Sequence, residues 1–487
     1  MINKLVPLIF DDSVKGRRGY VNPPSGVDTK APIPQAYLRK SECNWPEVSE
    51  LDVVRHFTRL SRMNYSVDTH FYPLGSCTMK YNPRITEKIA QLSGFTDLHP
   101  LLPQLKHGEK FAQGALQVLY EMEQLLCEIT GFKAFTMQPL AGAHGELSGV
   151  MMIAAYHKAK GNNKKNILVP DAAHGTNPAT AAIVGYEIVS VKTAPNGELD
   201  IEDLKTKVNQ DTAGMMMTCP DTHGIFQSQI DQIAEIIHAV DGLMYYDGAN
   251  LNAILGRCRP GDVGFDVMHI NIHKTFSAPH GGGGPGSGPV GVGERLLPFL
   301  PISRVVKNTD GDFALNYDYP QSVGYVASFY GNFSVILKAF AYTLLLGGQG
   351  LKETSDHAVL NANYVRACLK DRYELPYDRI CMHEVVFSAS EQVKRGVHTL
   401  DIAKFLIDKG FHPPTIYFPM TVKEAIMIEP TETESRQSID EFIQAMIEAD
   451  ELSKTDPESF HNMPTTMPIS RPDDVKAAKD INTCYHC

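Results

Sequence analysis

The stretch Leu243-Met244-Tyr245-Tyr246-Asp247 decides the fold that we expect for this chain of 487 residues. Its four apolar or aromatic residues have the length of a buried strand rather than of a helix, and the run ends in a carboxylate. A strand that is apolar on both faces is typical of a parallel sheet covered by helices on both sides. The stretch therefore predicts a strand inside an α/β sheet, with Asp247 at its carboxyl end.

Short apolar runs recur from about residue 130 to 293, and amphipathic or Ala-rich stretches alternate with them. This alternation predicts a mostly parallel sheet, and a ligand of such a sheet binds beyond the carboxyl ends of the strands. The expected strands are 134–137, 167–169, 187–191, 215–219, 243–247, 267–271 and 289–292. The expected helices between them are 142–160, 178–184, 201–208 and 229–240.

The composition changes along the chain and predicts four parts. Proline and short polar clusters are typical of an arm, which one helix near residues 48–62 interrupts. A long apolar helix that ends at Gly347-Gly348 separates a large domain from a smaller α/β domain with strands 383–388 and 425–428 and helices 399–409 and 434–452. The expected parts are an N-terminal arm (1–105), a large domain (106–330), a small C-terminal domain (331–456) and an extended tail (457–487).

Charge and length exclude several classes of protein. With 45 basic and 56 acidic residues the formal charge is −11, so the basic surface of a nucleic-acid binder is not expected. No stretch approaches the 18 or more consecutive apolar residues of a membrane span. The apolar start of the chain is followed at once by Asp11 and Asp12, which does not fit a secretory signal. We therefore expect a cytoplasmic protein without a membrane partner.

The nine cysteines are scattered through a long chain, which is not the pattern of a disulfide scaffold. The last four residues, Cys484-Tyr485-His486-Cys487, form a C-x-x-C pair. Such a pair is compatible with redox chemistry or with metal binding, but it offers three ligands where structural zinc takes four. The spacing of His269, His273 and His280 matches no zinc motif. We expect no metal site, and a tail without essential chemistry.

Lys274 and Asp247 together predict a site for pyridoxal phosphate (PLP). This cofactor needs a lysine that holds it as a Schiff base and an acidic partner for its pyridine nitrogen. Asp247 ends one expected strand and Lys274 follows a later one, and the glycine run 281–284 after Lys274 would let the backbone approach a ligand closely. Taken alone, a lysine beside a histidine is more typical of a solvated loop.

Two further βα turns could complete the site. Ala141, Gly142 and Ala143 lie between an expected strand and a helix, where backbone N–H groups and a helix N-terminus bind phosphate. An ordinary βα turn has similar small residues. His174 follows the next strand and could lie flat on a cofactor ring, although most isolated histidines are surface or core groups. The G-x-G-x-x-G spelling of 286–291 is rejected as a dinucleotide site because no helix is expected inside it.

Several separated blocks of the sequence resemble one known family. They are 16–20 (Gly-Arg-Arg-Gly-Tyr), 68–83, 138–149, 171–178, 269–288 and 429–435. The chain resembles glycine dehydrogenase (decarboxylating), the P-protein of the glycine cleavage system, and in particular its separate C-terminal-type subunit. The resemblance implies an α/β fold of PLP fold type I, with a seven-stranded mostly parallel sheet and a smaller C-terminal domain.

The resemblance also implies roles for residues. Lys274 would bind PLP covalently, Asp247 would pair with the pyridine nitrogen, and His174 would stack on the ring. The remaining cofactor contacts would come from Ala141, Gly142, Ala143, Ala249 and Thr275. Ser76 and Cys77 would border the substrate channel. Relatives carry two asparagines where this chain has Cys219 and Asp221.

The implied activity is that of glycine dehydrogenase (aminomethyl-transferring). Glycine is decarboxylated and its aminomethyl group passes to the lipoyl arm of the H-protein. A companion subunit 1 that lacks the lysine is implied, in an α2β2 heterotetramer. Two alternatives stay open: another fold-type-I enzyme (an amino-acid decarboxylase, an aldolase, or a cysteine desulfurase with Cys77 as its thiol), and a non-catalytic subunit that retains the fold.

Overall fold

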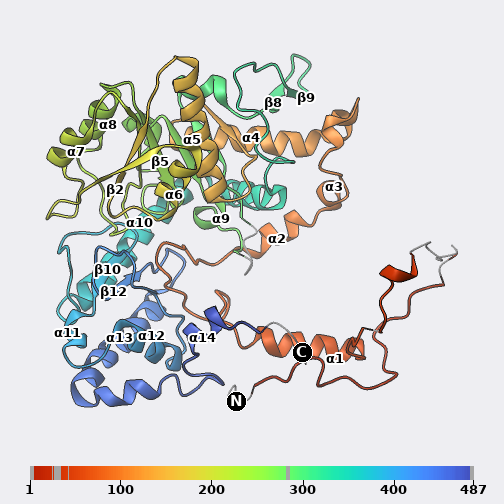
Figure 1. The fold of residues 1–487 in the computed structure, drawn as a ribbon, viewed down its shortest axis with the longest axis vertical. Coiled ribbons are helices and arrows are strands. Elements are labelled where there is room, and N and C mark those ends of the chain that lie inside the picture. Colours follow the sequence, from red (N-terminus) through yellow and green to blue (C-terminus); the bar gives the residue numbers. More distant parts are fainter. Residues whose placement is uncertain (1–4, 25, 27–33, 42, 281–285, 483–487) are drawn as a thin grey trace. The chain divides into compact units, whose positions relative to one another are not determined.

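In the computed structural model of the protein, seven strands form one sheet in the order β1-β7-β6-β5-β4-β2-β3 (Figure 1). Strand β7 runs antiparallel to its neighbours β1 and β6, and the other pairings are parallel. The predicted mostly parallel sheet is therefore confirmed. The strands are β1 (Ala134–Thr136), β2 (Asn166–Pro170), β3 (Glu187–Val191), β4 (Thr212–Met217), β5 (Leu243–Gly248), β6 (Val267–Ile270) and β7 (Val290–Val292).

Helices cover both faces of this sheet, as the apolar strands require. Along β5, Leu243 and Tyr245 join one apolar cluster, and Met244 and Tyr246 join another. Figure 1 shows α7 and α8 on one side of the strands and α5 on the other. The covering helices are α4 (Gln113–Thr130), α5 (Gly142–Ala159), α6 (Thr176–Val184), α7 (Ile201–Lys207) and α8 (Ile230–His238).

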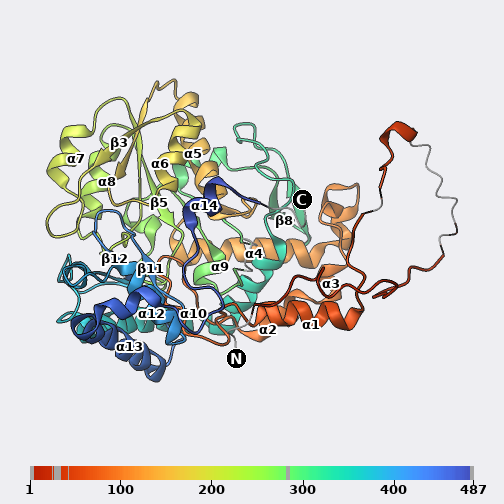
Figure 2. The same ribbon diagram turned by 60° about the horizontal axis from the view of Figure 1, so that its bottom comes forward.

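A smaller α/β part follows in the chain. Its antiparallel sheet has the order β10-β12-β11, and helices α12 and α13 lie beside it (Figure 2). The predicted C-terminal α/β domain is therefore confirmed. The elements are β10 (Val385–Ser388), β11 (Thr415–Ile416), β12 (Ala425–Ile428), α11 (Ser390–Val393), α12 (Thr399–Asp408) and α13 (Arg436–Thr455).

The long element α10 (Phe333–Leu369) consists of two helical segments that meet at a kink. Gly347 leaves the helical region (φ 61°, ψ −176°), so the predicted end of the first helix at Gly347-Gly348 is confirmed. The second segment, which continues to Leu369, was not predicted. It buries apolar residues such as Ala358 and Val365, and this packing stabilises it as a helix.

Several short elements before and after α4 in the chain were not predicted from the sequence. The hairpin of β8 (Arg304–Lys307) and β9 (Phe313–Asn316) was missed. The prediction of a single helix in residues 1–105 was wrong, because α2 (Arg84–Ala90) and α3 (Ser93–Thr96) follow α1 (Glu50–Ser61). These helices have only one or two turns, too short for a periodic apolar pattern to show.

The structure describes residues 5–24, 26, 34–41, 43–280 and 286–482. They form two compact units: unit 1 is Met1–His70 with His461–Cys487, and unit 2 is Phe71–Phe460. The four predicted parts have other boundaries and stay a prediction. The glycine run 281–284 and the Cys484–Cys487 tail lie outside the described residues.

Unit 1 contains α1 and α14 (Asp474–Lys479). Ser49 and Asp52 form a capping box at the start of α1, which satisfies two backbone N–H groups that the helix leaves unpaired. Arg17 binds Asp52 at 2.9 Å. Leu51, Val54 and Phe57 of α1 are more than half exposed, so this helix presents an apolar stripe.

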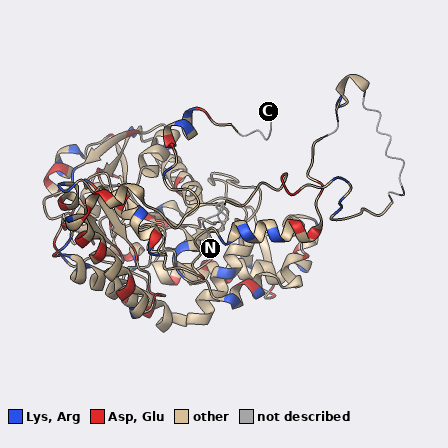
Figure 3. Cartoon of the chain, turned by 90° about the horizontal axis from the view of Figure 1, so that it is seen from below, with Lys and Arg blue, Asp and Glu red and all other residues tan. Residues whose placement is uncertain are grey.

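Two features bear on the expectation that neither nucleic acid nor a membrane is a partner. Lys and Arg are interspersed with Asp and Glu along the chain (Figure 3). Helix α10 is long and apolar enough to cross a membrane by length and composition alone, a test that core helices of soluble proteins also pass. Both expectations stay predictions.

Replacement of Gly149 by Ala tests the packing of α5 on the sheet. A Cβ at this position would lie 2.4 Å from Cε2 of Tyr245 and 3.2 Å from Cγ2 of Val267. Tyr245 cannot move freely, because its hydroxyl bonds to His269 at 2.8 Å. We expect a loss of about 1–3 kcal/mol in the free energy of unfolding, measured in urea.

Gly94→Ala is the matched control, since nothing lies within 4 Å of a Cβ at that helical position. This variant should be unchanged or up to about 1 kcal/mol more stable. Equal stabilities of the two variants would contradict the packing described for α5.

Candidate functional site

The predicted site residues meet at one cavity of unit 2, at the carboxyl ends of the parallel strands. The predicted residues that line it are Ser76, Gly142, Ala143, His174, Asp247, Ala249 and Lys274. Three others lie behind the lining. Ala141 is the residue before α5, Cys77 follows Ser76, and buried Thr275 accepts the N–H of Leu251. The sequence prediction thus brought together residues that the fold places side by side, and their roles stay predictions.

Lys274 lies in α9 (Ile272–Thr275), the short helix that follows β6. Its Nζ donates a hydrogen bond of 2.6 Å to the carbonyl oxygen of Ser76. The amine is therefore held at the cavity wall by a neutral acceptor. An amine in such a contact can exchange that acceptor for a ligand without breaking an ion pair.

Asp247 ends β5 and is buried. Its Oδ2 accepts from Nδ2 of Asn177 at 2.9 Å and its Oδ1 from the N–H of Ala249 at 3.1 Å. Burial alone would raise the pKa of Asp247, but His269, these two hydrogen bonds and the ammonium of Lys274 together lower the pKa below its usual value. Asp247 is thus a buried, ionised carboxylate at the cavity.

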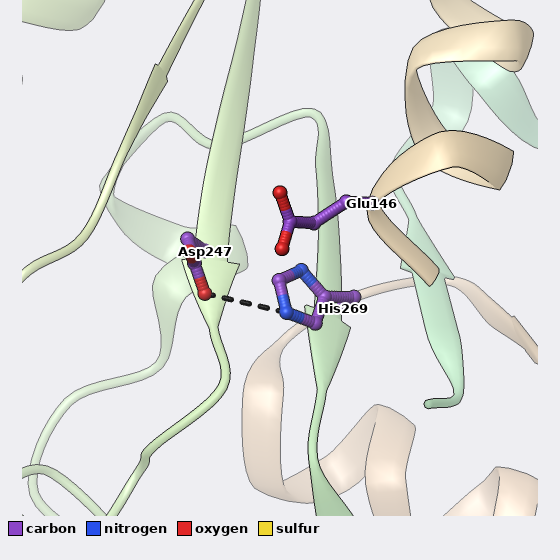
Figure 4. A group of neighbouring side chains, drawn as sticks. All are labelled: Glu146, Asp247 and His269. Atoms are coloured by element: carbon purple, nitrogen blue, oxygen red, sulfur yellow. Dashed lines mark ion pairs between the residues drawn. The ribbon is translucent and has the colours of Figure 1, made fainter. Parts of the chain in front are cut away.

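A second carboxyl group, Glu146 of α5, faces Asp247 and His269 (Figure 4). Nε2 of His269 lies 3.3 Å from Oδ1 of Asp247. Burial and the negative charge of Asp247 raise the pKa of Glu146 to about 7, against the hydrogen bonds from Asn177 and Thr176. The two neighbouring carboxyl groups therefore have pKa values shifted in opposite directions.

The start of α5 supplies backbone donors. The first N–H groups of a helix have no partner inside it and attract anions. Gly142 begins the helix and packs closely on Asn271. An added Cβ at Gly142 would lie only 2.1 Å from Oδ1 of Asn271. That Oδ1 is buried and has no hydrogen-bond partner among the described residues. This corner can therefore accept a ligand with an anionic group and a donor.

Two glutamates from the C-terminal part hold the wall at Gly75–Thr78. Glu384 accepts from the N–H of Ser76 at 2.9 Å. Glu429 accepts from the N–H of Thr78 at 2.9 Å and from its hydroxyl at 2.7 Å. Ser76 and Thr78 have φ values of 64° and 53°, in the left-handed region that non-glycine residues seldom adopt. These hydrogen bonds fix the carbonyl that receives Lys274.

Several cavity residues were missed by the sequence analysis: Glu146, Thr176, Thr218, Pro220, Asp221, Thr222, Asn250, His269, Asn271, His383 and Glu384. Glu146 lies inside α5. It was missed because the sequence pattern points to residues at the ends of strands and not to residues within helices. His383 and Glu384 precede β10, whereas the sequence predicted them at the start of strand 383–388, away from its carboxyl end. Asn250 could have been found, because it comes just after Asp247 and Ala249. Asp221 lines the cavity, so the loop 218–224, in which this sequence differs from its relatives at Cys219 and Asp221, does reach the site.

Two groups of side chains have ligand atoms close enough for a metal ion. They are Glu146, Asp247 and His269, and His383, Glu384 and Glu429, with ligand atoms within 4.8 Å of one another in each group. The expectation of no metal stays a prediction.

The buried pair of Lys80 and Glu432 braces the same wall and provides a test. Nζ of Lys80 lies 2.7 Å from Oε1 of Glu432, and the lysine is 2% exposed. Lys80→Met leaves a buried carboxylate without its cation. We expect a loss of about 3–5 kcal/mol in the free energy of unfolding, measured by urea denaturation.

Lys394→Met is the control, because Lys394 pairs with Glu391 on the surface. Surface pairs contribute less than about 1 kcal/mol. A loss at Lys80 no larger than that at Lys394 would show that the buried pair does not hold the wall.

Comparisons with known proteins point to one family. A family profile described as "Glycine cleavage system P-protein" matches residues 27–314, more than half of the chain. A second, "Glycine dehydrogenase, C-terminal domain", matches residues 354–464.

Full-length relatives carry a related name. A protein of Caldanaerobacter subterraneus subsp. tengcongensis, named "Probable glycine dehydrogenase (decarboxylating) subunit 2", is 52% identical over 484 residues, 99% of each sequence. A protein of Bacillus velezensis with the same name is 51% identical over 483 residues, 98% of this chain and 97% of the relative.

Solved structures share the fold. The crystal structure of an inhibitor-bound glycine decarboxylase (P-protein) of the glycine cleavage system has a TM-score of 0.71 at 18% identity, and the match covers 85% of this chain and 93% of that one. A Lactobacillus brevis glutamate decarboxylase has a TM-score of 0.63 at 12% identity, covering 85% and 96%. At these identities the likeness concerns the fold, and the predicted fold class is confirmed.

Proposed function

This chain belongs to the family of decarboxylating glycine dehydrogenases, the P-proteins of the glycine cleavage system, and we propose on that premise that it decarboxylates glycine with PLP as its cofactor. The activity is that of EC 1.4.4.2. The observation that carries the proposal is the presence of Lys274 and ionised Asp247 on one cavity. A non-catalytic subunit would have no use for this pair.

The residues of the cavity fit PLP in their chemistry. Lys274 offers an amine held only by a carbonyl oxygen. Asp247 offers a buried negative charge for a pyridine nitrogen. The N-terminus of α5 at Gly142 and Ala143 offers N–H groups for a phosphate, and Oδ1 of Asn271 is a buried acceptor without a protein partner. His174, Ala249 and Thr275 remain further predicted contacts.

When bound, PLP supplies a sink for the electrons that remain on a substrate carbon after carbon dioxide leaves. The chain's own residues prepare the site for that chemistry. Ionised Asp247 would hold a proton on the pyridine nitrogen of the bound cofactor. Lys274 would hold the cofactor covalently through its Nζ. Glu384 and Glu429 hold the wall in place, because they accept from the backbone N–H groups of Ser76 and Thr78.

We propose that the aminomethyl group then passes to the lipoyl arm of the H-protein, as the family implies. Ser76 and Cys77 would border the path of that arm. Burial raises the pKa of the Cys77 thiol, which keeps the thiol protonated and disfavours its use as a nucleophile. This argues against the cysteine desulfurase alternative.

The relatives are named subunit 2, which implies a companion subunit 1 for this chain. We propose an α2β2 assembly of the two. The apolar stripe of Leu51, Val54 and Phe57 on α1 supports a protein partner, since exposed apolar patches mark interaction surfaces.

Lys274→Ala tests the covalent link. We expect the variant to fold with unchanged stability but to lose the borohydride-reducible attachment of PLP, because no other lysine is among the described residues that line the cavity. Mass-spectrometric mapping of the reduced peptide should place the label on Lys274 in the unmodified chain. The exposed Lys394→Ala variant should keep the label. A label on another lysine would refute the assignment.

Exchange of labelled carbon dioxide into glycine tests the substrate. With PLP, subunit 1 and lipoylated H-protein supplied, the unmodified chain should catalyse exchange, and Lys274→Ala should lower the rate at least about 10³-fold, as loss of a covalent catalytic group does. Exchange with another amino acid but not with glycine would favour a different fold-type-I enzyme.

A further inference from the structure

A chain of hydrogen bonds links His174, at the cavity, to the buried carboxyl group of Glu146. Oγ1 of Thr176 lies 2.8 Å from Nδ1 of His174 and 2.8 Å from Oε1 of Glu146. The backbone N–H of Thr176 also points at Nδ1 of His174, at 3.3 Å. The other oxygen of Glu146 accepts from Nδ2 of Asn177 at 2.9 Å. One hydroxyl group therefore stands between an imidazole and a carboxyl group.

We propose that Glu146, acting through the hydroxyl of Thr176, sets which ring nitrogen of His174 carries the proton. Glu146 and Thr176 are positioning residues, since neither acts on a ligand directly in this account. The inference rests on the proposed function only in taking His174 as a residue that meets the cofactor.

The hydroxyl of Thr176 has a single proton, so it can donate a hydrogen bond to Glu146 or to His174 but not to both. When Glu146 is ionised, Thr176 donates to Oε1 and must accept from Nδ1–H of His174. When Glu146 carries a proton on Oε1, it donates to Thr176, and the hydroxyl donates to Nδ1. The proton of the neutral imidazole then lies on Nε2. Nε2 thus changes from acceptor to donor when Glu146 takes up a proton.

The surroundings of Glu146 decide which state is populated. The charged and titratable groups around it are Asp247 and Tyr245 of β5, His269 of β6, Lys274 of α9 and, through Thr176, His174. The side chain is buried. Burial and the charge of Asp247 raise the pKa of Glu146 to about 7. Below that pH Glu146 is neutral, Nδ1 accepts and Nε2 carries the proton; above it the arrangement reverses.

A backbone contact of Thr176 also bears on which ring nitrogen of His174 carries the proton. The N–H of Thr176 faces Nδ1, and a backbone N–H can only donate, so Nδ1 is an acceptor in the observed geometry. Oε2 of Glu146 is occupied by the donor Asn177, which leaves Oε1 as the oxygen that carries the proton. The contacts of Nδ1 and of Oε2 thus match the arrangement with neutral Glu146, while the hydroxyl of Thr176 lies within hydrogen-bond distance of Oε1 in either protonation state.

The test is nitrogen NMR of the full-length chain loaded with PLP and carrying ¹⁵N-labelled histidine, recorded between pH 6 and 9. A His174→Asn spectrum assigns the signals. In the unmodified chain, Nδ1 should change from an unprotonated to a protonated signal as pH rises, with a midpoint near the pKa of Glu146. Imidazolium is recognised because both of its nitrogens are protonated. The measurement follows the imidazole of His174 and not turnover. A chain that does not catalyse glycine exchange can therefore be told apart from a chain in which Glu146 does not control His174.

Three variants separate the proposal from a purely structural role. In Glu146→Gln the amide donates to Thr176 at every pH, so neutral His174 should keep Nδ1 unprotonated throughout. Thr176→Val should remove the response to Glu146, and Thr176→Ser should restore it. Glu121→Gln in α4, which alters a hydrogen bond with Gln117 and is not among the residues that line the cavity, should behave as the unmodified chain. A Glu146→Gln spectrum that titrates as the unmodified chain, or no difference between Thr176→Val and Thr176→Ser, would overturn the proposal.

Discussion

The site depends on one buried negative charge, the carboxylate of Asp247 at the end of β5. An isolated carboxylate in such a place would take up a proton. Two hydrogen bonds, from Asn177 and from the N–H of Ala249, and the nearby ammonium of Lys274 keep it ionised. The neighbouring Glu146, whose pKa is raised to about 7, takes up a proton at a higher pH than Asp247 does. The fold thus keeps a negative charge on Asp247 at a pH where the neighbouring carboxyl group is neutral.

Residues far apart in the chain must meet to build the other walls. The carbonyl that receives Lys274 belongs to Ser76, and Ser76 is held by Glu384. Thr78 is held by Glu429 beside it. The N-terminal wall, the lysine and the C-terminal sheet are therefore linked by hydrogen bonds, and the large and small α/β parts of unit 2 contribute to one site.

The sequence predicted the parts that obey local rules. Asp247 and Lys274 were found because one ends an apolar strand and the other follows one, where ligands of parallel sheets bind. Glu146 was missed because its role comes from tertiary contact with β5 and β6 and not from its place in α5. His383 and Glu384 were missed because they lie just before β10 of the small sheet and not at the carboxyl end of a parallel strand. The continuation of α10 past Gly347 was missed because packing outweighs the local cost of the break.

A crystal structure of the chain with PLP tests the central claim most directly. The account predicts continuous density between Nζ of Lys274 and the cofactor, with a carboxylate oxygen of Asp247 within hydrogen-bond distance, about 2.6–3.2 Å, of the pyridine nitrogen. Density that attaches the cofactor to another side chain, or a pyridine nitrogen turned away from Asp247, would contradict it.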